Sequence, residues 1–269
     1  MERRNLSQIL KDAKIDYRRE YDRLYEIFYE LGTGKKDQVL RDACANAFWN
    51  MPMRGTCLSL DDFDEVYGIH FEKEPHYFDL NYLLDFCEYT YNLVIYTSFN
   101  AWEYGVYTPN SVFLNQLDKV VELIGYKFLH DNDTSVDILV PCKQEALAVA
   151  EIVDEKLSYS VLEYNHHSLE GNVAKKKAIL KLIADDIEPQ RKILNSINKN
   201  LSDNLFQMFQ KFVRHNNEDN PYIKSLSPKE IEDCYDDIYQ MWLLAKLEID
   251  NLDRKKRVAD VLQKINSER

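Results

Sequence analysis

The side chains best suited to acid–base and phosphate chemistry are four consecutive polar residues, Arg214, His215, Asn216 and Asn217, which follow an apolar run ending at Val213. Arg214 carries a permanent charge and a planar set of five donors that suits a phosphate. His215 can exchange a proton near neutral pH. Metal-independent RNA cleavage needs such groups to move two protons and to stabilise the phosphorane charge. An ordinary helix C-terminus, where cations compensate the helix dipole, fits the same residues.

A second polar cluster occupies residues 165–172 and contains His166, His167, Glu170 and Asn172. On a helix, Glu170 would lie one turn from both imidazoles. Three interpretations fit: the beginning of a metal site, a helix start capped by Ser168 or Asn165 with structural hydrogen bonds, or a contribution to an active site. No third metal ligand is evident and HEXXH is absent, so we expect no metal and no cofactor.

A third cluster lies in residues 233–240, where Asp236 and Tyr239 occupy neighbouring faces of one helical turn. Such a pair can orient an imidazole or a guanidinium across a helical bundle. It can equally form the partly exposed flank of a helix. We therefore assign a site centred on Arg214 and His215. Its supporting residues are Asp236, Tyr239, Asn216 and Asn217, together with His166, His167, Glu170 and Asn172 of the second cluster.

Helices are expected to position these clusters. Gly and Pro are scarce, at seven residues each, which argues against a fold with many tight turns. Apolar residues recur at helical spacing in most of the chain. The expected helices cover 5–30, 36–51, 59–66, a long apolar segment from 79, a segment after 109, 143–160, 168–187, about 190–197, 201–214 and a segment from 227.

One β signal interrupts the helices. Two apolar runs within 125–141 flank the polar turn cluster 131–135, which predicts a small hairpin. A strong helix start is predicted at Ser227. Ser227 is the N-cap, Pro228 is the first helical residue, and Glu230 completes a capping box with Ser227. The predicted fold is mainly α, one or more helical bundles with one small β-hairpin near 125–141.

Charge divides the 269 residues into two regions. Residues 1–160 contain 16 Lys and Arg against 28 Asp and Glu, whereas residues 161–269 contain 18 of each. We predict an acidic, aromatic-rich helical region over 1–160 and a helical bundle with a basic C-terminal helix over 161–269. The net charge of −12 disfavours non-specific DNA binding.

Sequence signals for a membrane or for an oxidising compartment are missing. No run of 18 apolar residues occurs, and a mixed charged segment follows Met1. The five cysteines are scattered and show neither disulfide nor zinc spacing. We therefore expect a cytoplasmic protein with reduced, buried thiols and without a membrane partner. The aromatic residues of 77–107 are expected to form core and interface.

Several short segments together carry a resemblance to a known family. In the second region they are 166–172 (HHSLEGN), 176–180 (KKAIL), Glu188 with Arg191, 214–217 (RHNN) and 235–241 (YDDIYQM). In the first region they are Leu40-Arg41, Phe48-Trp49-Asn50, Phe99-Asn100 and the hairpin from Gly125-Tyr126 to Pro141. The second set resembles the C-terminal portion of bacterial abortive-infection proteins of the AbiJ type, which is similar to the HEPN helical fold. The first set resembles the N-terminal regions that accompany it.

The resemblance implies phage defence by an RNA-cutting toxin. HEPN ribonucleases are metal-independent and usually dimeric, with an Arg and a His four to six residues apart in a shared cleft. Arg214 matches that arginine, but residues 219–221 are Asp, Asn and Pro, and the nearby imidazole is His215. This chain either uses His215, with or without His166 or His167, or is not a nuclease.

Two classes of function follow. The first is a HEPN-like RNA endonuclease that acts as a homodimer on RNA. The second is a non-catalytic helical interaction or sensor module, bound to a phage protein or to another protein of a defence system. The distances between His166, His167, Arg214 and His215 separate these hypotheses most cheaply, since their convergence would favour the nuclease.

Overall fold

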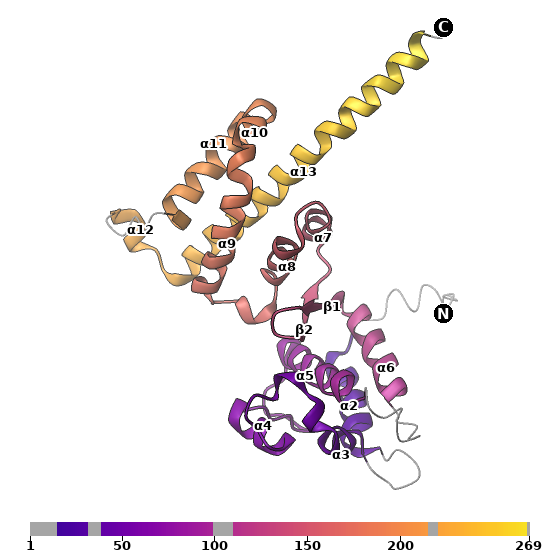
Figure 1. Cartoon of the computed structure of the whole chain (residues 1–269). Coiled ribbons are helices and arrows are strands. Elements are labelled where there is room, and N and C mark those ends of the chain that lie inside the picture. Colours follow the sequence, from indigo (N-terminus) through magenta and orange to yellow (C-terminus); the bar gives the residue numbers. More distant parts are fainter. Residues whose placement is uncertain (1–14, 32–38, 99–109, 215–219, 268–269) are drawn as a thin grey trace, which may run out of the picture. The chain divides into compact units, whose positions relative to one another are not determined.

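The structure is a computed structural model that describes residues 15–31, 39–98, 110–214 and 220–267 (Figure 1). The chain divides into two compact units, Met1–Leu139 and Val140–Arg269, which we call unit 1 and unit 2. This division comes earlier than the predicted change at 160/161, because the helices over 144–163 pack against later helices of unit 2.

Unit 1 is helical except for its part of the hairpin. Its elements are α2 (Tyr17–Tyr25), the π-helical η1 (Glu26–Glu30), α3 (Leu40–Asn46), the 3-10 turns η2 (Phe48–Asn50) and η3 (Pro52–Arg54), α4 (Leu60–Tyr67), α5 (Leu80–Ser98), α6 (Asn110–Leu123) and β1 (Tyr126–Asp131). The strand β2 (Val136–Pro141) pairs with β1 and contains the division between the units.

Aromatic side chains fill the core of unit 1. Tyr21 and Phe28 of its first helical segment are fully buried together with Phe86 of α5 and Phe113 of α6. The rings of Tyr21 and Phe86 lie 5.0 Å apart, edge to face, which is a favourable arrangement. Of the aromatic residues of 77–107, several belong to this core or pack against it, as predicted: Phe78, Tyr82, Phe86, Tyr89 and Tyr91. Tyr77 is 72% exposed and does not, and residues 99–107 lie outside the described part of the chain.

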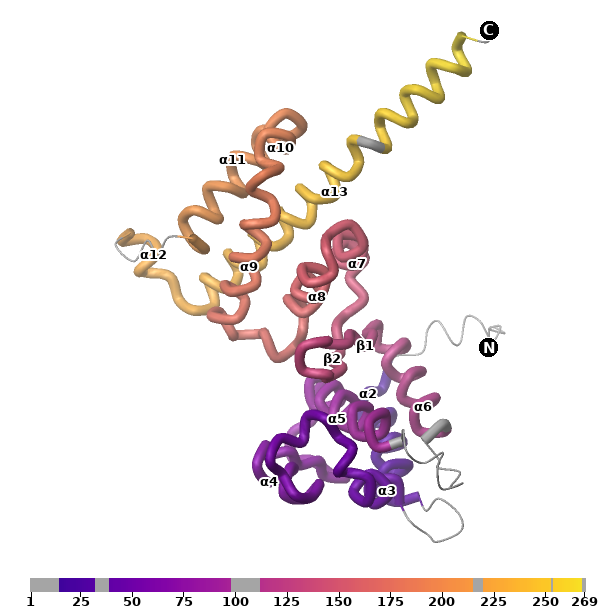
Figure 2. The backbone as a smooth tube through the Cα atoms, viewed as in Figure 1, coloured from indigo at the N-terminus to yellow at the C-terminus, as the bar shows by residue number. Residues whose placement is uncertain are grey.

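Unit 2 is a helical bundle. Its elements are α7 (Gln144–Ala150), α8 (Glu155–Glu163), η4 (His167–Leu169, 3-10), α9 (Val173–Ile187), η5 (Glu188–Gln190, 3-10), α10 (Arg191–Ile197), α11 (Lys199–Met208), η6 (Phe209–Arg214, π), α12 (Pro221–Ser225) and α13 (Pro228–Ser267). The helix α13 packs against α7, α9, α10 and α11 and buries Tyr239 and Trp242. Figure 2 shows its C-terminal part (yellow) continuing past the ends of α10 and α11.

The predicted fold class, mainly α with one small hairpin, is confirmed for the described residues. Individual helices differ from their predicted ranges. The expected helix 143–160 is two helices, because Asp154 caps a new start by accepting from the N–H of Leu157. The expected helix from 168 begins at Val173, because Asn172 caps it there.

None of the described helices combines the length and the apolar character needed to cross a membrane.

All five cysteines are free thiols; Cys44, Cys57 and Cys87 are buried, and Cys142 and Cys234 are partly exposed. Burial raises the pKa of the Cys44 thiol to about 11, which makes it a poor nucleophile.

Candidate functional site

Arg214 is held at the end of η6 by three oxygen atoms. Its Nη1 group donates to Glu188 Oε2 at 2.5 Å, and its Nη2 group donates to Ala184 O at 3.0 Å and to Asp185 Oδ1 at 3.1 Å. Its side chain keeps 29% exposure. Two of the five N–H groups of Arg214, at Nε and at Nη1, donate no hydrogen bond to another described residue. The guanidinium is therefore oriented by α9 and η5 while part of it faces solvent.

The segment that carries Arg214 is anchored on a second side. The phenolic hydroxyl of Tyr235 on α13 donates to Phe212 O at 3.3 Å, and Val213 is fully buried. Short π-helical segments recur at functional sites, since they redirect side chains at a helix end. The next residues of the predicted site, His215, Asn216 and Asn217, lie outside the described residues.

The cluster 165–172 forms local caps at the other end of α9. The Nδ1 atom of His166 accepts from the N–H of Ser168 at 3.2 Å and lies 2.8 Å from its hydroxyl. The ring of His167 lies 4.3 Å from that of His166. Asn172 Oδ1 accepts from the N–H of Lys175 at 3.1 Å, which caps α9. Local caps are thus present, but His166 and Asn172 form them and not Ser168 or Asn165, because the helix α9 begins only at Val173.

Unit 2 does not bring His166 and His167 together with Arg214. The guanidinium binds Ala184 and Asp185 near the C-terminal end of α9, whereas Asn172 caps the N-terminal end. Twelve residues of α-helix separate Asn172 from Ala184, or about 18 Å. Glu170 is exposed at the end of η4, beside the histidines and not beside Arg214. Within one chain, the predicted supporting residues at 166–172 thus cannot act on a phosphate held by Arg214. The convergence that would have favoured the nuclease hypothesis is not found, and of the predicted pair only Arg214 lies among the described residues.

A partly buried ion-pair cluster lies at the N-terminal end of α9 and involves Asp236, whose side chain is 45% exposed. Lys176 Nζ lies 2.8 Å from Asp236 Oδ1 and 2.8 Å from Glu232 Oε1. Tyr164 Oη donates to Asp236 at 2.9 Å, and the N–H of Gly171 donates to Glu232 Oε1 at 2.8 Å. The lysine and Glu232 are almost fully buried. Asp236 therefore orients an ammonium and a phenol, and not the imidazole or guanidinium that the sequence suggested.

The cluster perturbs two acid–base groups. The hydrogen bond from Lys176 holds the pKa of Glu232 at about 2, against the opposing effect of burial. Burial raises the pKa of Tyr164, and the negative charge of Asp236 raises it further. At neutral pH Glu232 is therefore ionised and the Tyr164 phenol is neutral. It joins α9 and α13 and the loop that contains Gly171.

Tyr239 belongs to an adjoining polar chain. Its hydroxyl donates to Val161 O at 2.7 Å and accepts from the Asn165 amide at 2.9 Å. Lys143 Nζ donates to the same Asn165 side chain at 2.7 Å. The rings of Tyr239 and Tyr164 stack at 4.1 Å. Tyr239 therefore links α8 and α13 and does not contact Arg214.

Sequence reasoning missed Tyr164, Lys176 and Glu232. A signal was present, because Glu232 and Asp236 are one turn apart on α13 and so share a face that a cation can bridge. Which cation bridges them was not predictable from sequence. Lys175, Lys176 and Lys177 are consecutive, and only the rotation of α9 in the bundle places Lys176 inward.

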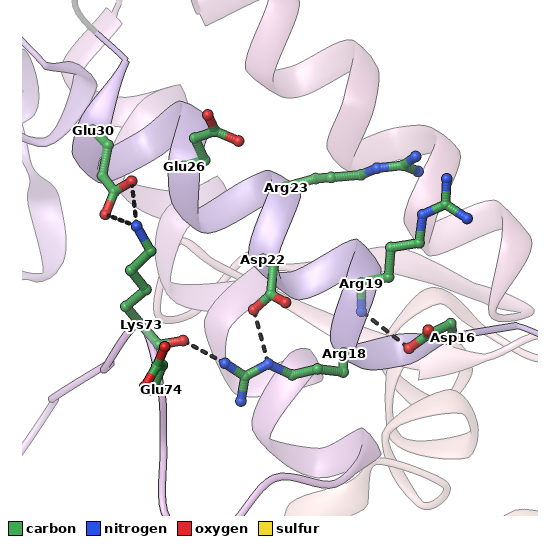
Figure 3. Close-up of a pocket in the computed structure, with 9 residues that line it drawn as sticks. All are labelled: Asp16, Arg18, Arg19, Asp22, Arg23, Glu26, Glu30, Lys73 and Glu74. Atoms are coloured by element: carbon green, nitrogen blue, oxygen red, sulfur yellow. Dashed lines mark hydrogen bonds and ion pairs between the residues drawn. The ribbon is translucent and has the colours of Figure 1, made fainter.

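A charged hollow of about 480 Å³ lies in unit 1 and is drawn in Figure 3. Its cations are largely bound by neighbouring oxygens: Arg18 pairs with Asp22 at 2.8 Å, and Lys73 pairs with Glu30 at 2.8 Å. Both pairs are substantially exposed, so each contributes little to stability. We therefore interpret this hollow as part of a surface ion-pair network and not as a functional site.

Comparisons with protein-family models, with curated proteins and with solved structures found no match to this chain.

Proposed function

We propose that this protein is an antiphage effector of the abortive-infection type and that unit 2 cleaves RNA without a metal at Arg214 and His215. The observation that supports this proposal is the position of Arg214. Three oxygens orient its guanidinium, part of it is exposed, and His215 follows directly in the sequence. An arginine fixed before substrate arrives loses less entropy when it binds a phosphate.

The proposed reaction needs a base, an acid and a group that stabilises the phosphorane charge. The 2′-hydroxyl of one nucleotide attacks its own phosphorus as a base removes the hydroxyl proton. The bond from phosphorus to the 5′-oxygen then breaks, and an acid protonates that oxygen. Arg214 neutralises the charge that develops on the phosphorane oxygens. His215 serves one proton transfer. A second copy of the chain supplies the other, as the expected homodimer allows.

The carboxylates beside Arg214 are compatible with this role. The Asp185 side chain is 78% exposed, so a phosphate can displace it at little cost. Glu188 is less exposed and also lies 3.6 Å from Arg191. In the proposal Glu188 keeps the guanidinium oriented, and Asp185 gives way to RNA.

Toxicity in a bacterial host tests the proposal. We expect that expression of the wild-type chain stops growth and that His215→Ala removes this effect. Lys211→Ala is the matched control, because Lys211 is an exposed cation on the same η6 segment. Equal toxicity of the wild type and His215→Ala, at equal soluble protein levels, would contradict the proposal.

A second candidate is a non-catalytic interaction module, which the exposed end of α13 favours. Val258, Val261, Leu262 and Ile265 are each more than half exposed and fall within about 100° of one helix face. Lys255 lies on one edge of this stripe, and Arg257 and Lys264 lie on the other. Such a face fits an amphipathic helix of a partner protein that carries acidic residues at its own edges.

A further inference from the structure

The solvent side of α13 carries a repeat of seven residues. Leu244, Asn251, Val258 and Ile265 follow one another at this interval. Leu244, Val258 and Ile265 are 49%, 57% and 54% exposed, and Asn251 is exposed as well. Residues seven apart are displaced by only about 20° around an α-helix, so these four lie along one side of it. In the notation of coiled coils they occupy position a of successive heptads.

A second line of residues runs beside the first, three residues further on in each heptad, at position d. It contains Leu247, Arg254 and Val261. Leu247 is partly exposed and Val261 is 54% exposed. Arg254 Nη2 donates to Asp250 Oδ2 at 2.6 Å, so its charge is paired within the same helix and its aliphatic stem can pack. We call the residues at positions a and d, from 244 to 265, the seam; it is about 32 Å long.

The C-terminal end of α13 has no covering element among the described residues. Every residue from 254 to 267 is exposed, except for those of the seam's first half, which belong to the packed part of the helix. Figure 2 shows this end continuing past α10 and α11. Helical segments of such length are marginally stable without packing, and Val and Ile favour helix only weakly. A second helix laid on the seam would therefore stabilise this end of α13.

The residues at position a indicate which helix this is. Val258 and Ile265 are β-branched, and such residues at position a favour two strands. Asn251 points to two identical strands in parallel orientation. In a parallel pair each position a faces the same position of the other helix, so that the Asn251 amides of two copies can hydrogen-bond to each other. In an antiparallel pair position a faces position d, where this helix offers Arg254 and apolar residues but no amide.

We propose that residues 244–265 of α13 form a parallel, two-stranded coiled coil with the same residues of a second copy of this chain. The seam is then the surface through which the homodimer assembles. This proposal does not depend on RNA cleavage, because association is measured without RNA. An acidic helix of another protein, the second candidate above, would compete for the same surface, and the experiments separate the two.

Sedimentation equilibrium of the full-length protein from about 5 to 200 µM tests the pairing. We expect a monomer–dimer equilibrium. Val258→Ser combined with Ile265→Ser should weaken it at least about 10-fold, because two apolar residues leave each half of the seam. Both side chains are more than half exposed, so the fold is retained. Ala259→Ser combined with Gln263→Ser, exposed and outside the seam, is the matched control.

Two outcomes of this experiment would overturn the proposal. One is a wild-type chain that stays monomeric over the whole range, which would leave the seam to an acidic partner. The other is a dimer that the double change at Val258 and Ile265 does not weaken, which would place the contact between copies elsewhere.

Charge exchange at Asn251 tests the parallel orientation. Asn251→Asp and Asn251→Lys each place like charges opposite one another in a parallel pair, so each variant alone should associate more weakly than the wild type. An equimolar mixture should form a mixed dimer at least about 10-fold more tightly than either variant alone. Gln263→Asp mixed with Gln263→Lys is the control and should show no such preference. A mixture at position 251 that associates no better than its components would refute parallel pairing through the seam.

Discussion

At the scale of single residues, the sequence identified useful chemical groups but not their neighbours. Asp236 and Tyr239 form strong polar contacts, yet with Lys176, Tyr164, Asn165 and a backbone carbonyl. The guanidinium of Arg214 is oriented by the carboxylates of Glu188 and Asp185 and by the carbonyl of Ala184, which lie 26 to 30 positions earlier in the chain. Sequence spacing predicts contacts within one helix. Contacts between helices depend on packing, which spacing alone does not give.

Glu232 provides a prediction at this scale. Its pKa of about 2, against an ordinary 4.5, corresponds to about 3 kcal/mol of stabilisation at neutral pH. Because the pKa is lowered by folding, this stabilisation is complete above about pH 5 and is lost as the pH falls toward 2. In Glu232→Gln, the free energy of unfolding should therefore be lower at pH 7 and should fall less on acidification.

Urea denaturation at a series of pH values measures this difference. Glu170→Gln is the control, because Glu170 is exposed and no ion pair or hydrogen bond of its side chain is found among the described residues. It should follow the wild-type curve. If Glu232→Gln showed the same acid dependence as the wild type, Lys176 and Glu232 would not form the stabilising pair described here.

At the scale of elements, helix starts were predictable and helix interruptions were not. The capping box at Ser227 is confirmed, since the N–H of Ser227 donates to Glu230 at 2.7 Å and the N–H of Glu230 donates to the Ser227 hydroxyl at 3.3 Å. The helix expected from 59 does start there, since the N–H of Asp62 donates to the Ser59 hydroxyl at 3.1 Å. The hairpin is confirmed as well. The π-helical η6 was not foreseen, because its apolar residues continue the helical spacing of α11.

The exposed apolar stripe of α13, formed by Val258, Val261, Leu262 and Ile265, is predicted to be a docking surface. Replacing Val261 and Leu262 together with Ser should change the free energy of unfolding by less than about 1 kcal/mol, because both side chains are more than half exposed. It should abolish binding to an acidic amphipathic helical peptide, measured by fluorescence anisotropy. Gln263→Ser, on the opposite face, is the control. Peptide binding that survives the double change would exclude this stripe as the docking surface.

At the scale of the whole molecule, composition and helical periodicity predicted the fold class. The change in charge along the chain predicted two regions, but at a boundary that differs from the division between the units. The charge change near 160 does not coincide with the division at 139/140, because α7 and α8 carry acidic residues yet pack with the bundle of unit 2. The family resemblance and the RNA-cleaving role stay predictions. They concern Arg214 and a segment, 215–217, that lies outside the described residues.

Cleavage of a defined RNA by the purified full-length chain in excess EDTA tests the central claim most directly. The account predicts products with a 2′,3′-cyclic phosphate and a 5′-hydroxyl, and no cleavage where the attacking 2′-hydroxyl is replaced by hydrogen. Arg214→Ala and His215→Ala should each slow the reaction about 100-fold or more, whereas Lys211→Ala should not. An RNA that stays intact with the wild-type chain, or is cut equally fast by His215→Ala, would contradict the account.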